Sequence, residues 1–232
     1  MTCYFVTGTD TDAGKTLASS ALLALARRQG LSTLGLKPVA SGCQATAAGL
    51  RNIDALTLQA QSRPEVDYAT INPYAFEPPI APHLAARYAD AELTLARLER
   101  TIAPSLALGR DLTLIEGAGG YRVPLNEQED LAGLAPRLRL PVIVVIGLKL
   151  GCLNHALLTA EALARDGVVC AGWIGNLIDA DFAADETLYQ DNLAHLTARL
   201  PGPCLGIIPR LEGRDHKELA QQAAEYLTLP SG

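Results

Sequence analysis

Residues 8–16 read Gly-Thr-Asp-Thr-Asp-Ala-Gly-Lys-Thr and lie one residue after the apolar run at 4–6. An apolar strand, a glycine-bearing loop and a Lys-Thr helix start together predict a phosphate-binding loop. The reason is that the backbone N–H groups of such a loop, and the helix N-terminus behind it, point at an anion. We expect Lys15 to reach the outer phosphates of a nucleotide and the Thr16 hydroxyl to bind Mg²⁺.

The loop departs from the usual GxxxxGK[ST] pattern at its first glycine. That pattern has glycine at position 9, where this chain has Thr9, and the nearest glycine, Gly8, lies one residue earlier. The loop is therefore a variant, and residues elsewhere in the chain have to decide which class of phosphate-binding protein it belongs to.

Length, composition and charge restrict the class further. The 232 residues are 49% hydrophobic and carry a formal net charge of −6. A chain of this size forms a sizeable core, and we expect a single domain over residues 1–232. The acidic balance argues against nucleic-acid or membrane partners. The apolar run at 142–148 is too short to span a bilayer, and no signal segment opens the sequence, so we expect a cytoplasmic protein.

Apolar runs alternate with helix-like segments along the chain. Runs such as 142–146 are apolar at consecutive positions, which suits strands buried on both faces of a parallel sheet. Strands are expected at 3–7, 33–39, 111–115, 141–147, 168–174 and 204–208, and helices at 15–29, 91–108, 129–139, 153–165, 182–199 and 215–228. This alternation predicts an α/β fold with a doubly wound, mostly parallel sheet flanked by helices. Ligands of such sheets bind at the carboxyl ends of the strands.

A carboxylate and a glycine-rich turn, Glu-Gly-Ala-Gly-Gly at 116–120, follow the apolar run at 112–115. In P-loop enzymes an acidic residue at this place binds the Mg²⁺ of the nucleotide, and the glycines would let backbone approach the terminal phosphate. Taken alone, Glu116 is equally well a strand-end carboxylate before an ordinary turn. The loop at 8–16 favours the metal-binding interpretation.

Lys37 lies in the otherwise apolar strand-like run at 33–39. A lysine there is costly to bury unpaired. At the carboxyl end of the strand it would face the phosphates and neutralise charge that develops during phosphoryl transfer. By itself, the alternative of a lysine reaching solvent from an edge strand would be preferred. The flexible continuation Pro-Val-Ala-Ser-Gly at 38–42 favours the functional interpretation.

Residues after the later strands could read a nucleotide base. Asn176 and Asp179 stand where GTP-binding proteins carry N-K-x-D, but Leu177 replaces the lysine and breaks that guanine signature. Asn176 could instead pair with the edge of adenine, or it could end a strand in an ordinary turn. The sequence Ile-Ile-Pro-Arg-Leu at 207–211 ends the last strand, where a backbone turn could flank the base.

Two further signals are weaker. Asp54 follows the irregular stretch 40–53, which, with the proline-rich stretch 63–82, is a long loop of the kind that is functional or mobile. Asp54 alone reads as a carboxylate that favours a helix N-terminus. The helix start at 152–154 has free N–H groups for a carboxylate, or is a plain strand-to-helix connection. No lysine–histidine–carboxylate set surrounds Cys152 by spacing, so we assign it no nucleophilic role.

In this order, the elements resemble those of the dethiobiotin synthetase family over nearly the whole chain. The segments that carry the resemblance are Tyr-Phe-Val-Thr-Gly-Thr-Asp-Thr-Asp-Ala-Gly-Lys-Thr at 4–16, Lys-Pro-Val-Ala-Ser-Gly at 37–42, Gly-Leu-Arg-Asn-Ile-Asp-Ala at 49–55, Glu-Gly-Ala-Gly-Gly at 116–120 and Lys-Leu-Gly-Cys-Leu-Asn-His-Ala at 149–156. The displaced glycine is typical of that family, and generic P-loop ATPases lack the Lys-Pro pair. The chain departs from some relatives at Tyr121-Arg122, and residues 180–230 are the least similar stretch.

The resemblance implies an ATP-dependent ligase of biotin biosynthesis that uses Mg²⁺. In that family one amine of 7,8-diaminopelargonate takes up CO₂ to give a carbamate. The carbamate attacks the γ-phosphate of ATP to give a carbamic–phosphoric anhydride. The second amine then displaces phosphate and closes a cyclic urea, dethiobiotin. An anionic carbamate has to approach an anionic phosphate, so Lys15, Lys37 and Mg²⁺ would supply the required positive charge.

The resemblance also implies the site residues, with Lys15 and Lys37 catalytic and Thr16, Asp54 and Glu116 binding the metal. The residues implied for ATP are Asp12, Ala13, Gly14, Lys15, Thr16, Leu17, Asp54, Glu116, Gly117, Ala118, Gly119, Asn176, Leu177, Pro209, Arg210, Leu211 and Glu212. Those implied for the diamine or its carbamate are Thr11, Lys37 and Ser41. The family acts as a homodimer, in which Cys152, Leu153 and Asn154 of one subunit bind the substrate carboxylate in the site of the other.

Two other classes remain open from the sequence. A P-loop regulatory or partitioning ATPase shares the fold and the metal site, but it needs neither Lys37 nor Ser41. Its relatives often carry an additional lysine early in the loop, and none lies between Gly8 and Gly14. A non-catalytic nucleotide-binding scaffold would bind ATP without turning it over.

Overall fold

Six parallel strands form the central sheet in the computed structural model, which describes residues 1–213 and 215–230. Their order is β10-β9-β8-β1-β7-β2, and each neighbouring pair runs parallel. The strands are β1 (Thr2–Gly8), β2 (Thr33–Leu36), β7 (Leu112–Glu116), β8 (Val142–Leu148), β9 (Cys170–Leu177) and β10 (Cys204–Ile208). The predicted α/β fold with a doubly wound parallel sheet is confirmed.

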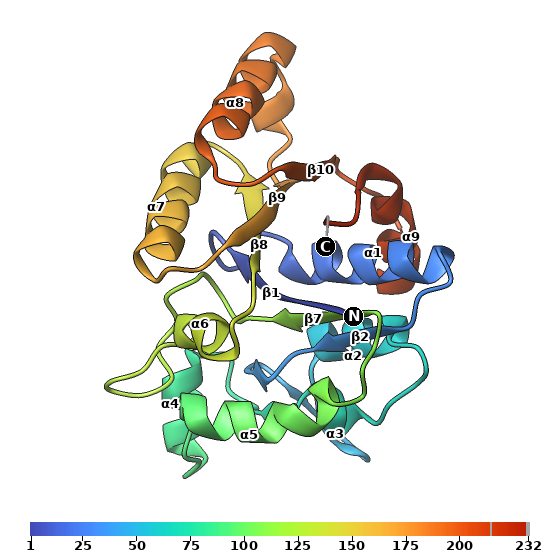
Figure 1. Cartoon of the computed structure of the whole chain (residues 1–232), viewed down its shortest axis with the longest axis vertical. Helices are drawn as coiled ribbons and strands as arrows, with labels where there is room; N and C mark the ends of the chain where they lie inside the picture. Colours follow the sequence, from blue (N-terminus) through green and yellow to red (C-terminus); the bar gives the residue numbers. More distant parts are fainter. Residues whose placement is uncertain (214, 231–232) are drawn as a thin grey trace.

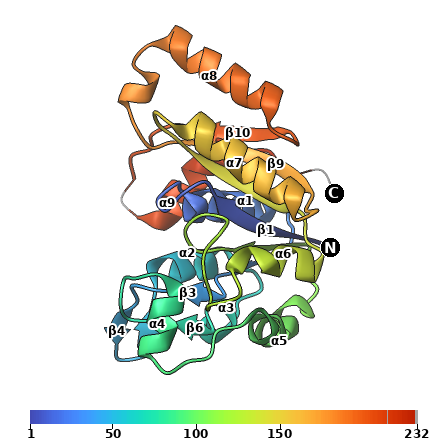
Figure 2. The same ribbon diagram turned by 90° about the vertical axis from the view of Figure 1, so that its left-hand side faces the viewer.

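Helices cover both faces of this sheet (Figure 1, Figure 2). One face carries α1 (Lys15–Arg28), α2 (Ile53–Gln61) and α9 (His216–Ala223), which contact one another, and the other carries α5 (Leu95–Leu106), α6 (Leu134–Leu138) and α7 (Cys152–Arg165). Helix α8 (Glu186–Arg199) packs on α7 at one end of the molecule. Because helices lie on both sides, β8 at the centre of the sheet has no polar side chain, and all of it is buried.

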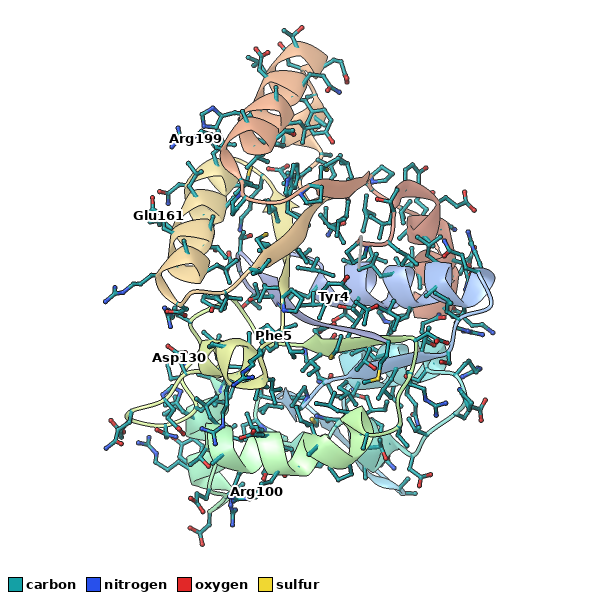
Figure 3. All side chains as sticks on the ribbon, in the orientation of Figure 1. Tyr4, Phe5, Arg100, Asp130, Glu161 and Arg199 are labelled. Carbon is teal, nitrogen blue, oxygen red and sulfur yellow. The ribbon has the colours of Figure 1, made fainter. Side chains whose placement is uncertain are left out.

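The core lies between the sheet and these helices. Tyr4 and Phe5 of β1 are 2% and 1% exposed, and Figure 3 shows both in the interior, whereas Arg100 and Glu161 lie at the periphery. Phe5 is in register with Ile115 on one neighbouring strand and with Val142 on the other. This pairing fixes the carboxyl ends of β1, β7 and β8 at one edge of the sheet, which is the edge that the sequence predicts to bind ligand.

The segment predicted as one strand at 33–39 is shorter than expected. Strand β2 ends at Leu36, and β3 (Val39–Ala40) pairs instead with β6 (Tyr74–Ala75) in a separate two-stranded sheet. Pro38 lies at the break, and a proline has no N–H group with which to continue a ladder. Lys37 therefore lies just beyond the strand end rather than inside the strand.

The two stretches predicted as irregular contain short elements. Residues 40–53 hold the antiparallel pair β4 (Gln44–Thr46) and β5 (Gly49–Arg51), and residues 63–82 hold α3 (Tyr68–Ile71) and β6. Helices α2 and α4 (Pro82–Tyr88) are absent from the predicted set, because segments this short show little periodicity. Other predicted helices shorten, with 3₁₀ turns η1 (Leu131–Gly133), η2 (Asp181–Ala183) and η3 (Ala224–Tyr226) replacing parts of them.

Among the residues that the structure describes, none of the helices has both the length and the apolar character needed to cross a membrane.

Candidate active site

A cleft of about 390 Å³ opens at the carboxyl ends of β1, β2 and β7. Its walls are Thr11, Asp12, Gly14, Lys15, Thr16, Lys37, Ser41, Asn52, Asp54, Ala118 and Gly119. All but Asn52 are residues that the sequence predicts for the site, although they come from four separate segments. A larger hollow of about 740 Å³ lies over α4 and residues 125–129, where no phosphate loop or strand end contributes to its walls. The chemistry therefore points to the smaller cleft.

The phosphate loop has the curled backbone that an anion site needs. Asp12 and Gly14 both have positive φ, 59° and 92°, and Gly14 caps α1 by accepting the N–H of Ala18 at 3.0 Å. Alternation of left- and right-handed residues turns successive N–H groups into one concavity. A Cβ atom on Gly14 would lie 2.1 Å from the Asn176 Nδ2 atom. Glycine is required here by both conformation and space.

The displaced glycine has a steric reason. The Lys15 side chain folds back over the loop, so that its Nζ donates to the Asp10 carbonyl at 3.2 Å. A Cβ atom on Gly8 would lie 3.1 Å from both Cγ and Nζ of Lys15. Gly8 therefore makes room for the lysine, whereas Thr9 has an ordinary backbone and is tolerated where the usual pattern has glycine.

Lys37 is the centre of a buried charge cluster. Its Nζ donates to Glu116 Oε1 at 2.6 Å and to the Gly117 carbonyl at 3.1 Å, and it lies 3.0 Å from Asp54 Oδ2. Lys37 is 4% exposed and Glu116 is 1% exposed. The predicted alternative, a lysine that reaches solvent, is wrong, because this ammonium is buried between two carboxylates.

These charges shift one another's protonation. Burial by itself lowers the pKa of Lys37, but the Glu116 and Asp54 carboxylates outweigh burial and raise that pKa above its usual value. Burial would raise the pKa of Asp54, yet Lys37 holds it below the usual value. Burial lowers the pKa of Lys15, and the nearby Lys37 ammonium lowers it further. Two lysines and two carboxylates are thus brought together in the same cleft.

The oxygen atoms in this cluster fit a hard divalent cation. The Thr16 hydroxyl donates to Glu116 Oε1 at 2.8 Å, and its closeness to Asp54 contributes to the lowered pKa of that carboxyl. Glu116 Oε2 is buried and has no hydrogen-bond partner among the described residues, which leaves a carboxylate oxygen free for a further ligand. The described residues contain no group of three or more His, Cys, Asp or Glu that could hold a metal by themselves. A cation that takes few protein ligands and keeps waters and phosphate oxygens, as Mg²⁺ does, suits this set.

Asp54 serves two purposes at once. It lies in the first turn of α2, whose N-cap Asn52 accepts the N–H groups of Asp54 and Ala55 at 3.0 and 3.3 Å. The expectation of a helix-start carboxylate is therefore confirmed. The same helix start places the Asp54 carboxylate beside Lys37 and Thr16.

The residues predicted for the base lie at the same sheet edge but outside the cleft walls. Asn176 is 7% exposed, and its Nδ2 donates to the Ala13 carbonyl at 3.2 Å. Ile208 is in register with Asn176, and residues 209–212 follow directly after the end of β10. In the structure Asn176 supports the phosphate loop.

The start of α7 lies apart from the cleft of its own chain. Cys152 is 1% exposed, Leu153 is half-buried and Asn154 is exposed. Burial raises the pKa of the Cys152 thiol, which disfavours the thiolate that a nucleophile requires. An ion pair of 3.2 Å between Lys149 Nζ and Asp10 Oδ2 connects the phosphate loop to the turn before α7. The sequence analysis missed this pair, since no spacing rule joins two residues so far apart.

The chain is similar to known proteins both in its fold and in its sequence. A family model described as an AAA domain matches residues 2–217. The fold is similar to that of the MinC:MinD cell division protein complex of Aquifex aeolicus, with a TM-score of 0.58 and 14% identity over 96% of this chain and 86% of that one. The fold and the phosphate loop therefore define the class, a P-loop protein that uses a nucleotide.

Sequence similarity identifies the family within this class. The chain is 67% identical to the ATP-dependent dethiobiotin synthetase BioD of Chromohalobacter salexigens over an alignment of 234 positions, which covers 99% of this chain and 99% of that one. It is 56% identical to the ATP-dependent dethiobiotin synthetase BioD of Cellvibrio japonicus over 90% of this chain and 89% of that one. The chain belongs to the dethiobiotin synthetase family, as the resemblance in its motifs predicted.

Proposed function

We propose that this chain, as one catalytic domain over residues 1–232, closes 7,8-diaminopelargonate with CO₂ and ATP to dethiobiotin, the cyclic urea of biotin biosynthesis. Lys37 carries the proposal, because a buried ammonium between Glu116 and Asp54 lies in the same cleft as the phosphate loop. Binding or hydrolysis of a nucleotide requires Lys15 and a metal but not this second cation. Membership of the dethiobiotin synthetase family supports the same conclusion.

The proposed reaction has three steps. One amine nitrogen of the diamine attacks the carbon of CO₂ and loses a proton, which gives a carbamate. A carbamate oxygen attacks the γ-phosphorus, and the bond from that phosphorus to the β–γ bridging oxygen breaks, so that ADP leaves. The second amine attacks the carbamoyl carbon and loses a proton, the bond to the phosphorylated oxygen breaks, and phosphate leaves as the ring closes.

The residues of the cleft and of the neighbouring strand ends divide these tasks by charge and position. The backbone N–H groups of residues 12–17 bind the phosphates, and the Lys15 ammonium contacts the outer phosphates. Lys37 neutralises negative charge where carbamate and phosphate meet. Thr11 and Ser41, which line the cleft, hold the diamine or its carbamate. Asn176, Leu177 and residues 209–212 bracket the adenine, and Gly117, Ala118 and Gly119 lie against the terminal phosphate.

Thr16, Asp54 and Glu116 would hold Mg²⁺. When bound, this ion would neutralise the phosphate oxygens of ATP. The unpartnered Glu116 Oε2 atom is the observation in favour.

The substrate carboxylate is proposed to bind across a homodimer interface. The N–H groups at the start of α7, at 152–154, would receive it in the partner's site. Leu150, just before this helix start, and Leu158, within α7, are 90% and 56% exposed, as expected for side chains that a second subunit covers.

An omission assay tests the function. We expect ADP and phosphate release to require ATP, Mg²⁺, bicarbonate and 7,8-diaminopelargonate together, because phosphate transfer needs the carbamate. Mass spectrometry should detect dethiobiotin in the complete mixture alone. Turnover that continues without the diamine would contradict the proposal and favour a regulatory ATPase. Binding of ATP without turnover in any mixture would favour a scaffold.

A further inference from the structure

Three polar side chains, two of them outside the cleft walls, connect the segments that carry Lys37, Ser41 and Asp54. The Asn72 Nδ2 atom donates to the Lys37 carbonyl at 2.7 Å, and the Tyr68 hydroxyl donates to Asn72 Oδ1 at 2.9 Å. The same hydroxyl accepts the backbone N–H of Asn52 at 2.7 Å. A continuous chain of hydrogen bonds therefore runs from the strand end of β2 to the start of α2.

Asn52 then divides the connection in two. Its Oδ1 accepts the backbone N–H of Asp54 at 3.0 Å, and its Nδ2 donates to the Ser41 carbonyl at 3.3 Å. The two amide ends of one side chain thus hold a proposed metal ligand and a proposed substrate residue. Neither bond can be exchanged for the other, because one amide atom accepts and the other donates.

We propose that Asn72, Tyr68 and Asn52 act as a positioning relay that sets Lys37, Ser41 and Asp54 relative to one another in the proposed synthetase reaction. This inference rests on the proposed function of the same cleft. The relay residues hold the reacting groups through the backbone, and Asn52 also lines the cleft.

Burial raises the energetic cost of breaking a hydrogen bond in the relay. Asn72 is 3% exposed and Asn52 is 7% exposed, so a group that loses its partner is left without water in a low-dielectric environment. The Tyr68 ring is half-buried and lies under the guanidinium of Arg51, 4.2 Å from its centre. Removal of the hydroxyl alone would leave the Asn52 N–H and Asn72 Oδ1 unpaired while the ring keeps its packing.

The relay separates the two halves of the site. Lys37 is held on both sides by the 71–72 segment, since its N–H donates to the Ile71 carbonyl at 2.8 Å. The phosphate loop is supported differently, through Asn176 on β9 and Lys149 after β8. A disturbed relay should therefore affect the diamine and the metal more than the nucleotide, which a simple loss of folded protein cannot do.

The primary test compares Tyr68→Phe with Tyr74→Phe. Tyr74 is a matched control because its hydroxyl lies 3.5 Å from Thr101 Oγ1 on α5. Its contact with the relay is made by its backbone carbonyl, which accepts from Asn72 Nδ2 at 3.2 Å and is kept in the variant. For Tyr68→Phe we expect the diamine KM and the half-saturating Mg²⁺ concentration to rise and kcat to fall, each by about tenfold. The ATP affinity of Tyr68→Phe should equal that of the unmodified protein. For Tyr74→Phe, the ATP affinity and all kinetic constants should equal those of the unmodified protein.

A binding measurement gives a readout other than turnover. Calorimetric titration of 7,8-diaminopelargonate, with a non-hydrolysable ATP analogue present, should show about tenfold weaker binding to Tyr68→Phe. Thermal unfolding of both tyrosine variants keeps the comparison to folded protein. Suppose that the unmodified protein is active and that Tyr68→Phe has the same diamine affinity and kinetic constants as Tyr74→Phe. That result would refute the proposed relay and leave the proposed function unaffected.

A second pair of variants tests the division at Asn52. Serine can still cap α2 and hold the Asp54 N–H, whereas alanine cannot. We expect Asn52→Ala to raise both the half-saturating Mg²⁺ concentration and the diamine KM. Asn52→Ser should restore the Mg²⁺ value and leave the diamine KM raised, because the bond to the Ser41 carbonyl is lost. Equal losses for both constants in the two variants would overturn the division. If ATP turnover by the unmodified protein does not depend on the diamine, the proposed function itself is refuted.

Discussion

Replacement of Lys37 by alanine is expected to lower turnover by about 10³-fold while ATP still binds. The Lys37 ammonium is the cation proposed to meet the charge that forms between carbamate and γ-phosphate. The phosphate loop, Lys15 and the Thr16 hydroxyl all remain in the variant. The loss should therefore fall on kcat, and the ATP dissociation constant from equilibrium binding should change little.

The variant also carries a stability effect that the experiment has to separate. Glu116 has a fully buried side chain, and its ammonium partner lies 2.6 Å away. Removal of that partner leaves a buried carboxylate uncompensated, which costs on the order of 3–5 kcal/mol in the free energy of unfolding. Thermal unfolding should therefore show a lower midpoint, and kinetics are measured well below it.

Lys217 supplies the control for Lys37. It is an exposed lysine on α9, so Lys217→Ala removes the same charge from the protein as a whole. We expect it to keep normal kinetics and a normal unfolding midpoint. Near-normal kcat in folded Lys37→Ala would show that the assignment of this residue is wrong.

A methyl group on Gly14 is expected to weaken ATP binding by about 10²-fold. Two effects add at this position. The positive φ of 92° strains any L side chain, and the new Cβ would lie 2.1 Å from Asn176 Nδ2. The loop must move away from Asn176, and the N–H groups that cradle the phosphates move with it. Equilibrium titration with ATP and Mg²⁺ measures the loss.

The control variant Gly30→Ala separates the effect of backbone strain from the effect of the steric clash expected at Gly14. Gly30 follows α1 with a φ of 79°, and nothing lies within 4 Å of its added Cβ. This variant should lose about 1–2 kcal/mol of stability from backbone strain and bind ATP normally. If Gly14→Ala also binds ATP normally, the loop does not depend on the close approach between Gly14 and Asn176.

The sequence was sufficient where a short motif carries the geometry. The strand–loop–helix at 8–16 and the carboxylate at 116 lie at the predicted sheet edge because parallel strands align their carboxyl ends. Lys37 joins them at the same edge, although the predicted strand at 33–39 proved to end at Leu36, before Pro38, so that the lysine lies just beyond it. These positions follow from local rules on strands, prolines and glycines.

The sequence was insufficient where contacts join distant segments. The sequence identified the displaced Gly8 as a departure from the usual pattern, but its steric reason, the folded-back Lys15 side chain, is visible in the three-dimensional structure alone. The link from Asn72 through Tyr68 to Asn52 depends on how α3 packs on the start of α2. Asn52 two residues before Asp54 was a readable N-cap signal, whereas nothing local identifies Tyr68.

The oxygen atoms of the released phosphate test the central claim most directly. If a carbamate attacks the γ-phosphorus, phosphate gains its new oxygen from CO₂. With C¹⁸O₂, the diamine, ATP and Mg²⁺, and with sampling before the label exchanges into water, we predict phosphate that carries one ¹⁸O atom. Phosphate that instead acquires its new oxygen from ¹⁸O-labelled water would mean that water attacks ATP, which contradicts carbamate phosphorylation at this site.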